Sequence, residues 1–162
     1  MKDCVTVWVW AAILAGALCA GGCRTAEPLE RYDISRDGWT LAQGQGLWTG
    51  AAGADGLVVE VVFARHTDGR AQLQAFKEVI PLAIVQLGDG RWTVEDPLRK
   101  RRAGGVNGSG AAARFGWLQL ALTLNGRPLA SQWLARREEG GRFFLEDSAS
   151  GERFELVLEP GS

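Results

Sequence analysis

The chain has 162 residues, with 18 Lys and Arg against 19 Asp and Glu, and its formal net charge is -1 at pH 7. This balance excludes a strongly basic protein that holds nucleic acid by neutralising phosphates, and 46% apolar with 23% charged residues excludes a disordered chain. The length fits one domain, and 22 glycines beside 5 prolines favour β-structure with many turns.

Residues 1–22 have the layout of a secretory signal peptide. Lys2 supplies the positive start, the run 5–20 is apolar except for Thr6, and small residues close it. The run is short for a membrane-spanning helix, which needs about 20 apolar residues. Two other interpretations stay open at this point, namely simple secretion and an uncleaved anchor made of residues 5–22.

The end of this segment, Ala20-Gly21-Gly22-Cys23, resembles a bacterial lipobox. The resemblance implies that Cys23 is diacylated on its sulfur and begins the mature chain, and several acyl chains make a durable membrane anchor. Cys4 and Cys19 lie in the removed segment, so the mature chain has no pair of cysteines for a disulfide. Arg24 stands where an aspartate can signal inner-membrane retention, which implies by the same resemblance an outer-membrane location facing the periplasm.

The remaining chain divides into a lipidated start and tether, residues 23–38, and a single domain, residues 39–160. We expect the tether to be irregular or to contain a short capping helix. In the domain, short apolar and alternating stretches are separated by glycine turns, which predicts about eight antiparallel strands. The expected strands are 39–49, 57–66, 70–76, 82–87, 91–95, 129–136, 142–146 and 152–158.

Gly44 and Gly46 interrupt the first strand and indicate a bulge or a close approach of another backbone. Residues 96–110, which include the basic cluster 99–102, have the composition of a long loop that is either functional or mobile. Residues 111–124 carry leucines at every second position, as in a strand, but start and stop signals at Ser109 and Gly126 favour a helix.

No catalytic signature stands out in this sequence, and we expect a protein that is not an enzyme. His66 is the single histidine, and no Gly-x-Ser-x-Gly elbow accompanies it. With one histidine and an acylated cysteine, we expect no metal site, and no nucleotide or other cofactor. Glu60 is expected to face solvent, and the basic cluster 99–102 to be solvated or to meet lipid headgroups or an acidic partner. The tryptophans after the signal are expected in the core or in an apolar pocket: Trp39, Trp48, Trp92, Trp117 and Trp133.

A lipidated chain with hairpin-rich strands and a late helix resembles the lipoprotein-sorting factors of the LolA/LolB type. The stretches that carry the resemblance are 61–87, a strand, an Asp-Gly-Arg turn, a strand and an apolar loop, and 122–128, which reads LTLNGRP. The resemblance implies a mainly β (α+β) fold, an antiparallel open half-barrel with one or two covering helices around an acyl-chain cavity. Val79 and Ile80 correspond to an exposed apolar loop that passes cargo to the membrane, although this chain lacks the glycine of that loop.

The residues support a cavity independently, because positions 57, 59, 61 and 63 form a wholly apolar strand face that one helix covers only in part. We therefore expect a lipid-anchored acceptor in outer-membrane lipoprotein localisation, whose partners are the membrane, acylated lipoproteins or a periplasmic carrier, and no nucleic acid. The alternative is an envelope-anchored structural or interaction module with a filled core and no ligand. The candidates for the cavity or its core are Leu57, Val59, Val61, Phe63, Leu73, Leu82, Ile84, Trp92, Leu118 and Leu122.

Overall fold

The computed structural model describes residues 29–51 and 53–160. The proposed signal peptide and Cys23 lie outside these residues. The described part is one antiparallel sheet of nine strands with a single α-helix, α2 (Gly116–Leu124), and two 3-10 turns, η1 (Gly110–Arg114) and η2 (Glu139–Gly141). The strands are β1 (Trp39–Thr49), β2 (Gly56–His66), β3 (Ala71–Lys77), β4 (Ile80–Gly88), β5 (Arg91–Asp96), β6 (Arg101–Val106), β7 (Trp133–Arg137), β8 (Arg142–Asp147) and β9 (Arg153–Pro160).

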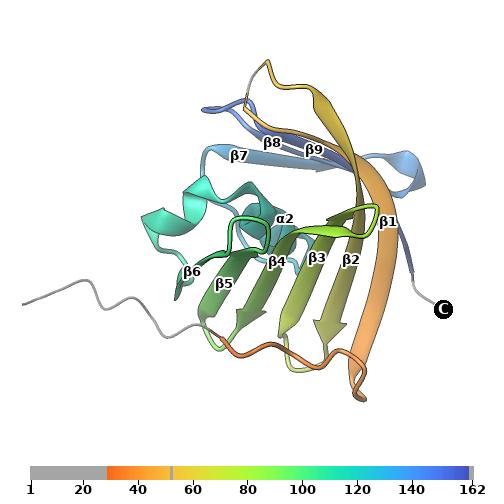
Figure 1. The fold of residues 1–162 in the computed structure, drawn as a ribbon, viewed down its shortest axis with the longest axis vertical. Coiled ribbons are helices and arrows are strands. Elements are labelled where there is room, and N and C mark those ends of the chain that lie inside the picture. The colour runs from red at the N-terminus through yellow and green to blue at the C-terminus, as the bar shows by residue number, and fades with distance from the viewer. Residues whose placement is uncertain (1–28, 52, 161–162) are drawn as a thin grey trace, which may run out of the picture.

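The sheet is open, with strand order β6-β5-β4-β3-β2-β1-β9-β8-β7. One wing is the meander from β1 to β6, and the other is formed by β9, β8 and β7, so β6 and β7 are the two edges. The sheet curves around α2, which lies between the two wings (Figure 1). The expected open antiparallel half-barrel with a covering helix is therefore confirmed.

The sharp curve at β1 depends on small side chains at its concave positions. Ala42, Gly44 and Gly46 pair with the core residues of β2 and so lie on the concave face. A Cβ atom on Gly44 would stand 2.8 Å from the carbonyl carbon of Val157 in β9, which no real side chain tolerates. The two glycines therefore let β9 fold over β1, so the predicted close approach of a second backbone is confirmed.

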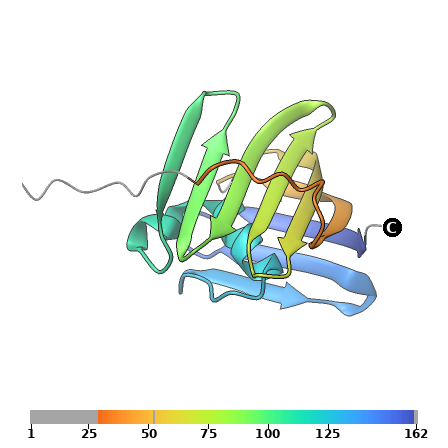
Figure 2. The same cartoon turned by 90° about the horizontal axis from the view of Figure 1, so that it is seen from below.

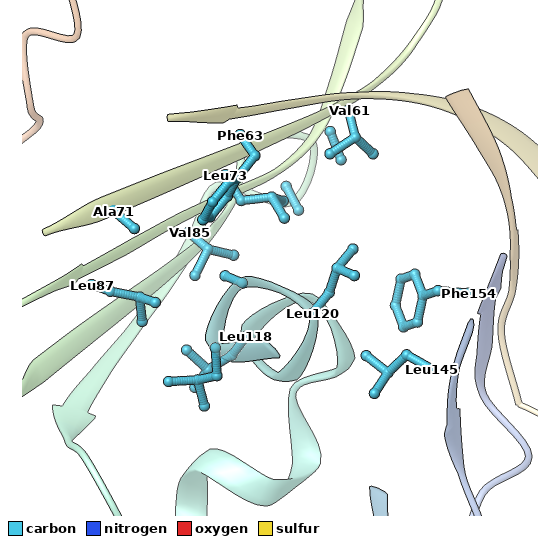
Figure 3. Close-up of a cluster of buried hydrophobic side chains, with 14 of the residues drawn as sticks. Val61, Phe63, Ala71, Leu73, Val85, Leu87, Leu118, Leu120, Leu145 and Phe154 are labelled. Carbon is cyan, nitrogen blue, oxygen red and sulfur yellow. The ribbon is translucent and has the colours of Figure 1, made fainter. Parts of the chain in front are cut away.

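Helix α2 fills the centre of the concavity. Leu118 and Leu120 are fully buried and lie among Leu73, Val85 and Phe154 of the sheet (Figure 3). Because α2 is enclosed by both wings, it is apolar on several sides, and this explains why its leucines at every second position resemble a strand.

The end of α2 follows its sequence signals, whereas its start does not. At the end, Gly126 has a φ of 68°, its N–H bonds to the Thr123 carbonyl, and the Arg127 N–H bonds to the Leu122 carbonyl. Helix formation is thus confirmed for 116–124. Ser109 instead precedes η1, and its side chain makes no capping hydrogen bond.

Two expected boundaries were wrong. The stretch 96–110 is not one loop, because residues 101–106 form the edge strand β6, paired along its whole length with β5. The sequence of β6, RRAGGV, has no apolar alternation from which a strand could be predicted. One reason is Gly105, where a side chain would collide with the Trp92 ring. Strand β7 begins at Trp133, four residues later than expected at 129, after a turn in which the Trp133 N–H bonds to the Ala130 carbonyl.

Residues 29–38 run across the convex face of β3 to β5 and contain no helix (Figure 2). The Leu29 N–H bonds to Thr93 Oγ1 at 3.0 Å, and Gln86 Nε2 donates to the Glu30 carbonyl at 2.6 Å. Further along, the Tyr32 hydroxyl reaches the Leu87 carbonyl at 3.3 Å. These contacts explain why polar residues such as Gln86 and Thr93 are buried on the outside of the sheet.

The nine paired strands and the core cluster of the described residues form one connected unit, so we expect residues 29–160 to fold on their own. In the part of the chain that the structure describes, no helix has the length and apolarity needed to cross a membrane.

Candidate functional site

The described residues enclose a pocket of about 940 Å³ at one end of the half-barrel. It lies where β1 ends, β4 begins and β5 turns into β6, and η1 leads into α2 beside it. Its volume falls within the range of about 300–1,000 Å³ typical of small-molecule sites. The apolar side chains around it are Trp48, Leu82, Ala83, Val94, Leu98, Ala103, Phe115 and Trp117.

Aromatic rings form the inner wall of this end pocket. Trp48 and Trp117 have centroids 5.2 Å apart, and Trp117 meets the buried Phe154 edge-on at 4.9 Å. Phe115 packs against Trp92 at 5.4 Å and so joins the pocket to the core. Such tilted and edge-on pairs are favourable arrangements of aromatic rings, so we expect the wall to be rigid without a ligand.

Leu82 enters the pocket because of a β-bulge. The register between β3 and β4 shifts at Ala75 and Phe76, so Ala83 pairs with Ala75 while Leu82 has no partner of its own. Leu82 and Ala83 both line the pocket in consequence. A regular strand would have placed Leu82 on the convex face.

The rim of the pocket is charged. Five cationic side chains line it, and three carboxylates accompany them, Glu95, Asp96 and Glu152. Arg99 holds Asp96 at 2.8 Å, and Arg31 from the N-terminal segment holds Glu95 at 2.7 Å. The cationic lining residues are Arg99, Lys100, Arg101, Arg102 and Arg114.

Glu152 is the carboxylate at the inner wall. It accepts a 2.9 Å hydrogen bond from the indole N–H of Trp48 and stands beside Gly116, the first residue of α2. Burial raises the pKa of Glu152, Asp147 raises it further, and the Trp48 hydrogen bond opposes the rise. A Cβ atom at position 116 would stand 2.5 Å from the Glu152 carboxyl carbon, so the Glu152 carboxylate would have to shift to admit one.

This raised pKa has a consequence for stability. Glu152 binds its proton more tightly in the folded protein than in the unfolded chain. The protonated side chain therefore contributes to stability in acid, and this contribution is lost as pH rises through the raised pKa. We expect Glu152→Gln, which keeps an oxygen for Trp48 but cannot ionise, to gain stability relative to wild type as pH rises from 4 to 7. Urea unfolding at a series of pH values measures this, and a constant difference between the two proteins would contradict it.

The structure separates the sequence-based cavity candidates into three groups. Leu82 lines the end pocket. Ile84 does not face the concavity, because it alternates with the buried Ala83 and Val85 and pairs with Gln74 and Glu95 on the convex side. The others pack in or against the filled core beneath α2: Leu57, Val59, Val61, Phe63, Leu73, Trp92, Leu118 and Leu122.

Val79 and Ile80 lie at the tip of the β3–β4 hairpin. Val79 is 90% exposed and Ile80 is 44% exposed, so the tip is an apolar projection as expected. In this meander the β3–β4 and β5–β6 turns lie at the same end of the sheet, which is also the end with the pocket. Leu98, 60% exposed, adds a second apolar tip there.

Comparisons with known proteins assign no family. Neither a scan against protein-family models nor a search of curated proteins gives a match to this chain. The site must therefore be interpreted from its own chemistry. Among the described residues, no group of three or more His, Cys, Asp and Glu side chains is placed to hold a metal ion.

His66 lies away from the end pocket, on the outer side of β2. Its ring packs against Trp39 at 5.0 Å, and its Nδ1 lies 2.8 Å from Asp68. Asp68 also accepts the backbone N–H of Arg70, and these bonds hold the pKa of Asp68 down to about 2. This cluster of His66, Asp68 and Arg70 fastens the N-terminal segment to the sheet, and the hollow beside it is smaller than the end pocket.

Two residues of the site escaped the sequence argument, Phe115 and Glu152. Trp117 was anticipated only in the general sense that a tryptophan can line an apolar pocket, and Arg101 only as a member of the basic cluster 99–102. Phe115 and Glu152 gave no signal, because each enters the pocket through tertiary packing of a segment that has no motif.

Proposed function

We propose that this chain is a lipid-anchored, non-enzymatic protein that binds acyl chains in its end pocket. We further propose that it takes part in outer-membrane lipoprotein localisation as an acceptor of acylated cargo. The observation that carries the proposal is the end pocket itself, an aromatic-walled hollow of about 940 Å³ that remains beside a filled core. A protein whose concavity served only as a core would have no need of this space.

The chemistry of the pocket wall suits an apolar chain. Apolar burial contributes about 25 cal/mol per Å², so contact with Trp48, Leu82 and Trp117 can hold an acyl chain without a strong polar bond. Part of that energy offsets the freedom that the ligand loses on binding. The rigid aromatic wall keeps the protein's own ordering cost small.

The path of the N-terminal segment supports the anchor. Leu29 is fixed to β5 through Thr93, and the Arg102 guanidinium donates to its carbonyl. Cys23 is six residues earlier, and six residues span at most about 20 Å. A diacylated Cys23 would therefore hold the edge of the sheet formed by β5 and β6 close to the bilayer, and with it the pocket end.

We expect Cys23→Ser to abolish acylation and to release the protein from the membrane fraction, because the variant has no thiol at the lipobox position. Labelling with a palmitate analogue, followed by fractionation of the envelope, measures both effects. A variant that is still labelled, or that stays membrane-bound to the same extent, would contradict the anchor.

The binding proposal is tested with residues 24–162, free of the anchor. The protein is titrated with a fluorescent fatty acid and, separately, with a purified acylated peptide. We expect saturable binding of both with one site per chain. Binding of neither by the folded domain would remove the acyl pocket from consideration.

One observation favours the alternative of an envelope-anchored interaction module. Twenty buried apolar residues fill the centre of the concavity, including most of the side chains first considered for the cavity. In that case the exposed tips at Val79 and Leu98 would be its contact surface, and the titration would show no binding.

A further inference from the structure

We propose that the end pocket selects amphiphiles with an anionic head, a carboxylate or a phosphate joined to an apolar chain, and that Arg101 and Lys100 hold that head. This inference rests on the proposed acyl-chain function and names the class of ligand. An apolar wall on one side and a cationic rim on the other form an amphipathic site. A neutral acyl chain would need only the wall.

The direction of Arg101 follows from the pleat of β6. Gly105 faces the Trp92 ring and Ala103 packs against the core, so the odd-numbered residues of this strand lie on the concave face. Arg101 shares that face and lines the pocket. Arg102 alternates with it, and its guanidinium reaches the Leu29 carbonyl on the convex side.

The carboxylates that line the pocket together with Arg101 are already engaged. Asp96 pairs with Arg101 in the strand register, but its two oxygens accept hydrogen bonds from the backbone N–H and the guanidinium of Arg99, at 3.0 and 2.8 Å. Glu95 is held by Arg31. Glu152 accepts the indole N–H of Trp48 at 2.9 Å.

Two rim cations remain for a ligand. Lys100 and Arg101 make no ion pair with any other described residue, and both are exposed at the mouth. Arg114, which also lines the pocket, already lies over the Phe115 ring at 5.2 Å. Lys100 has a φ of 51° at the β5–β6 turn, so the turn itself brings its neighbour Arg101 to the start of β6.

The head of an acyl chain that lies against Trp48 and Trp117 would therefore meet the positive charges of the rim. Guanidinium groups bind carboxylates and phosphates through two parallel hydrogen bonds. Neutral esters and alcohols lack the pair of anionic oxygens that accepts these bonds. The anion can come from a fatty acid or from a phospholipid, and both present the same chemistry to the rim. Because the rim is exposed to water, the preference is expected to weaken as salt rises.

The test compares three ligands of equal chain length with residues 24–162: myristate, myristoyl lysophosphatidate and neutral monomyristoylglycerol. Affinities are measured by tryptophan fluorescence in low and high salt. We expect both anions to bind about tenfold more tightly than the neutral lipid, and the double variant Lys100→Gln, Arg101→Gln to remove most of that advantage. The matched control is Arg137→Gln, which removes an exposed charge from β7, away from the pocket.

The outcomes separate this inference from the proposed function. Equal affinity for charged and neutral lipids, or a preference that survives the double variant, would overturn the headgroup inference and leave the acyl pocket standing. Failure of all three lipids to bind would overturn both. A preference for only one of the two anions would support the inference and identify whether the head is a carboxylate or a phosphate. The melting temperature of each variant verifies that it is folded.

Discussion

Replacing Gly44 by alanine is expected to lower the free energy of unfolding by about 3 kcal/mol or more. The new Cβ atom would stand 2.8 Å from the Val157 carbonyl carbon and 2.9 Å from the Leu158 Cα atom. These are backbone atoms of the paired strand, so relief requires β9 to move away from β1. That movement would open the corner at which the two wings meet and loosen the packing around Phe154.

The matched control is Gly50→Ala, six residues further along the chain. There a Cβ atom would meet only the Ala54 side chain, at 3.7 Å, which is ordinary contact. For a domain of this size, a loss of 3 kcal/mol lowers the melting temperature by about 10 °C. Thermal unfolding of the two variants decides the matter, and equal melting temperatures would show that the glycines are not what lets the sheet fold over.

The second large effect concerns ligand binding, and it is tested by matched substitutions at Leu82 and Ile84. We expect Leu82→Asn to weaken acyl-chain binding about tenfold, because an amide replaces an apolar side chain against the ligand. Ile84→Asn makes the same chemical change two residues away on the convex face and is expected to leave the affinity unchanged. Isothermal titration with a fatty acid gives both affinities.

The pair of variants also tests the bulge in β4. If both substitutions weakened binding equally, the ligand would not lie in the end pocket, or Leu82 would not point into it. If Ile84→Asn alone weakened binding, the concave and convex faces of β4 would be reversed from those described.

Much of the fold could be predicted from the sequence, because most strands alternate cleanly. The odd positions of β2 are apolar from Leu57 to Phe63, and the Asp-Gly turn at 68–69 places the next strand beside it. Glu60, expected in solvent, is exposed. The edge strand β6 could not be predicted, since it pairs through its backbone and carries arginines and glycines in place of an apolar pattern.

Less of the site than of the fold could be predicted from the sequence. A wholly apolar strand face indicates that another element must cover it. The sequence does not indicate how much of the concavity that element fills. Here α2 fills the centre, so residues such as Val61 and Leu73 belong to the core. The remaining space lies at one end and depends on a bulge at Leu82 and on Trp48, Phe115 and Trp117, which meet only in the folded chain.

The central claim is that an acyl chain lies against the aromatic wall of the end pocket. The most direct measurement titrates residues 24–162 with a dibrominated stearate, whose bromine atoms quench tryptophan fluorescence only on close approach. We expect strong, saturable quenching that is lost in the double variant Trp48→Phe, Trp117→Phe. It is kept in Trp39→Phe, because the Trp39 ring packs against Tyr32 and His66 on the other face. Quenching that survives the double variant, or that disappears with Trp39, would contradict the account.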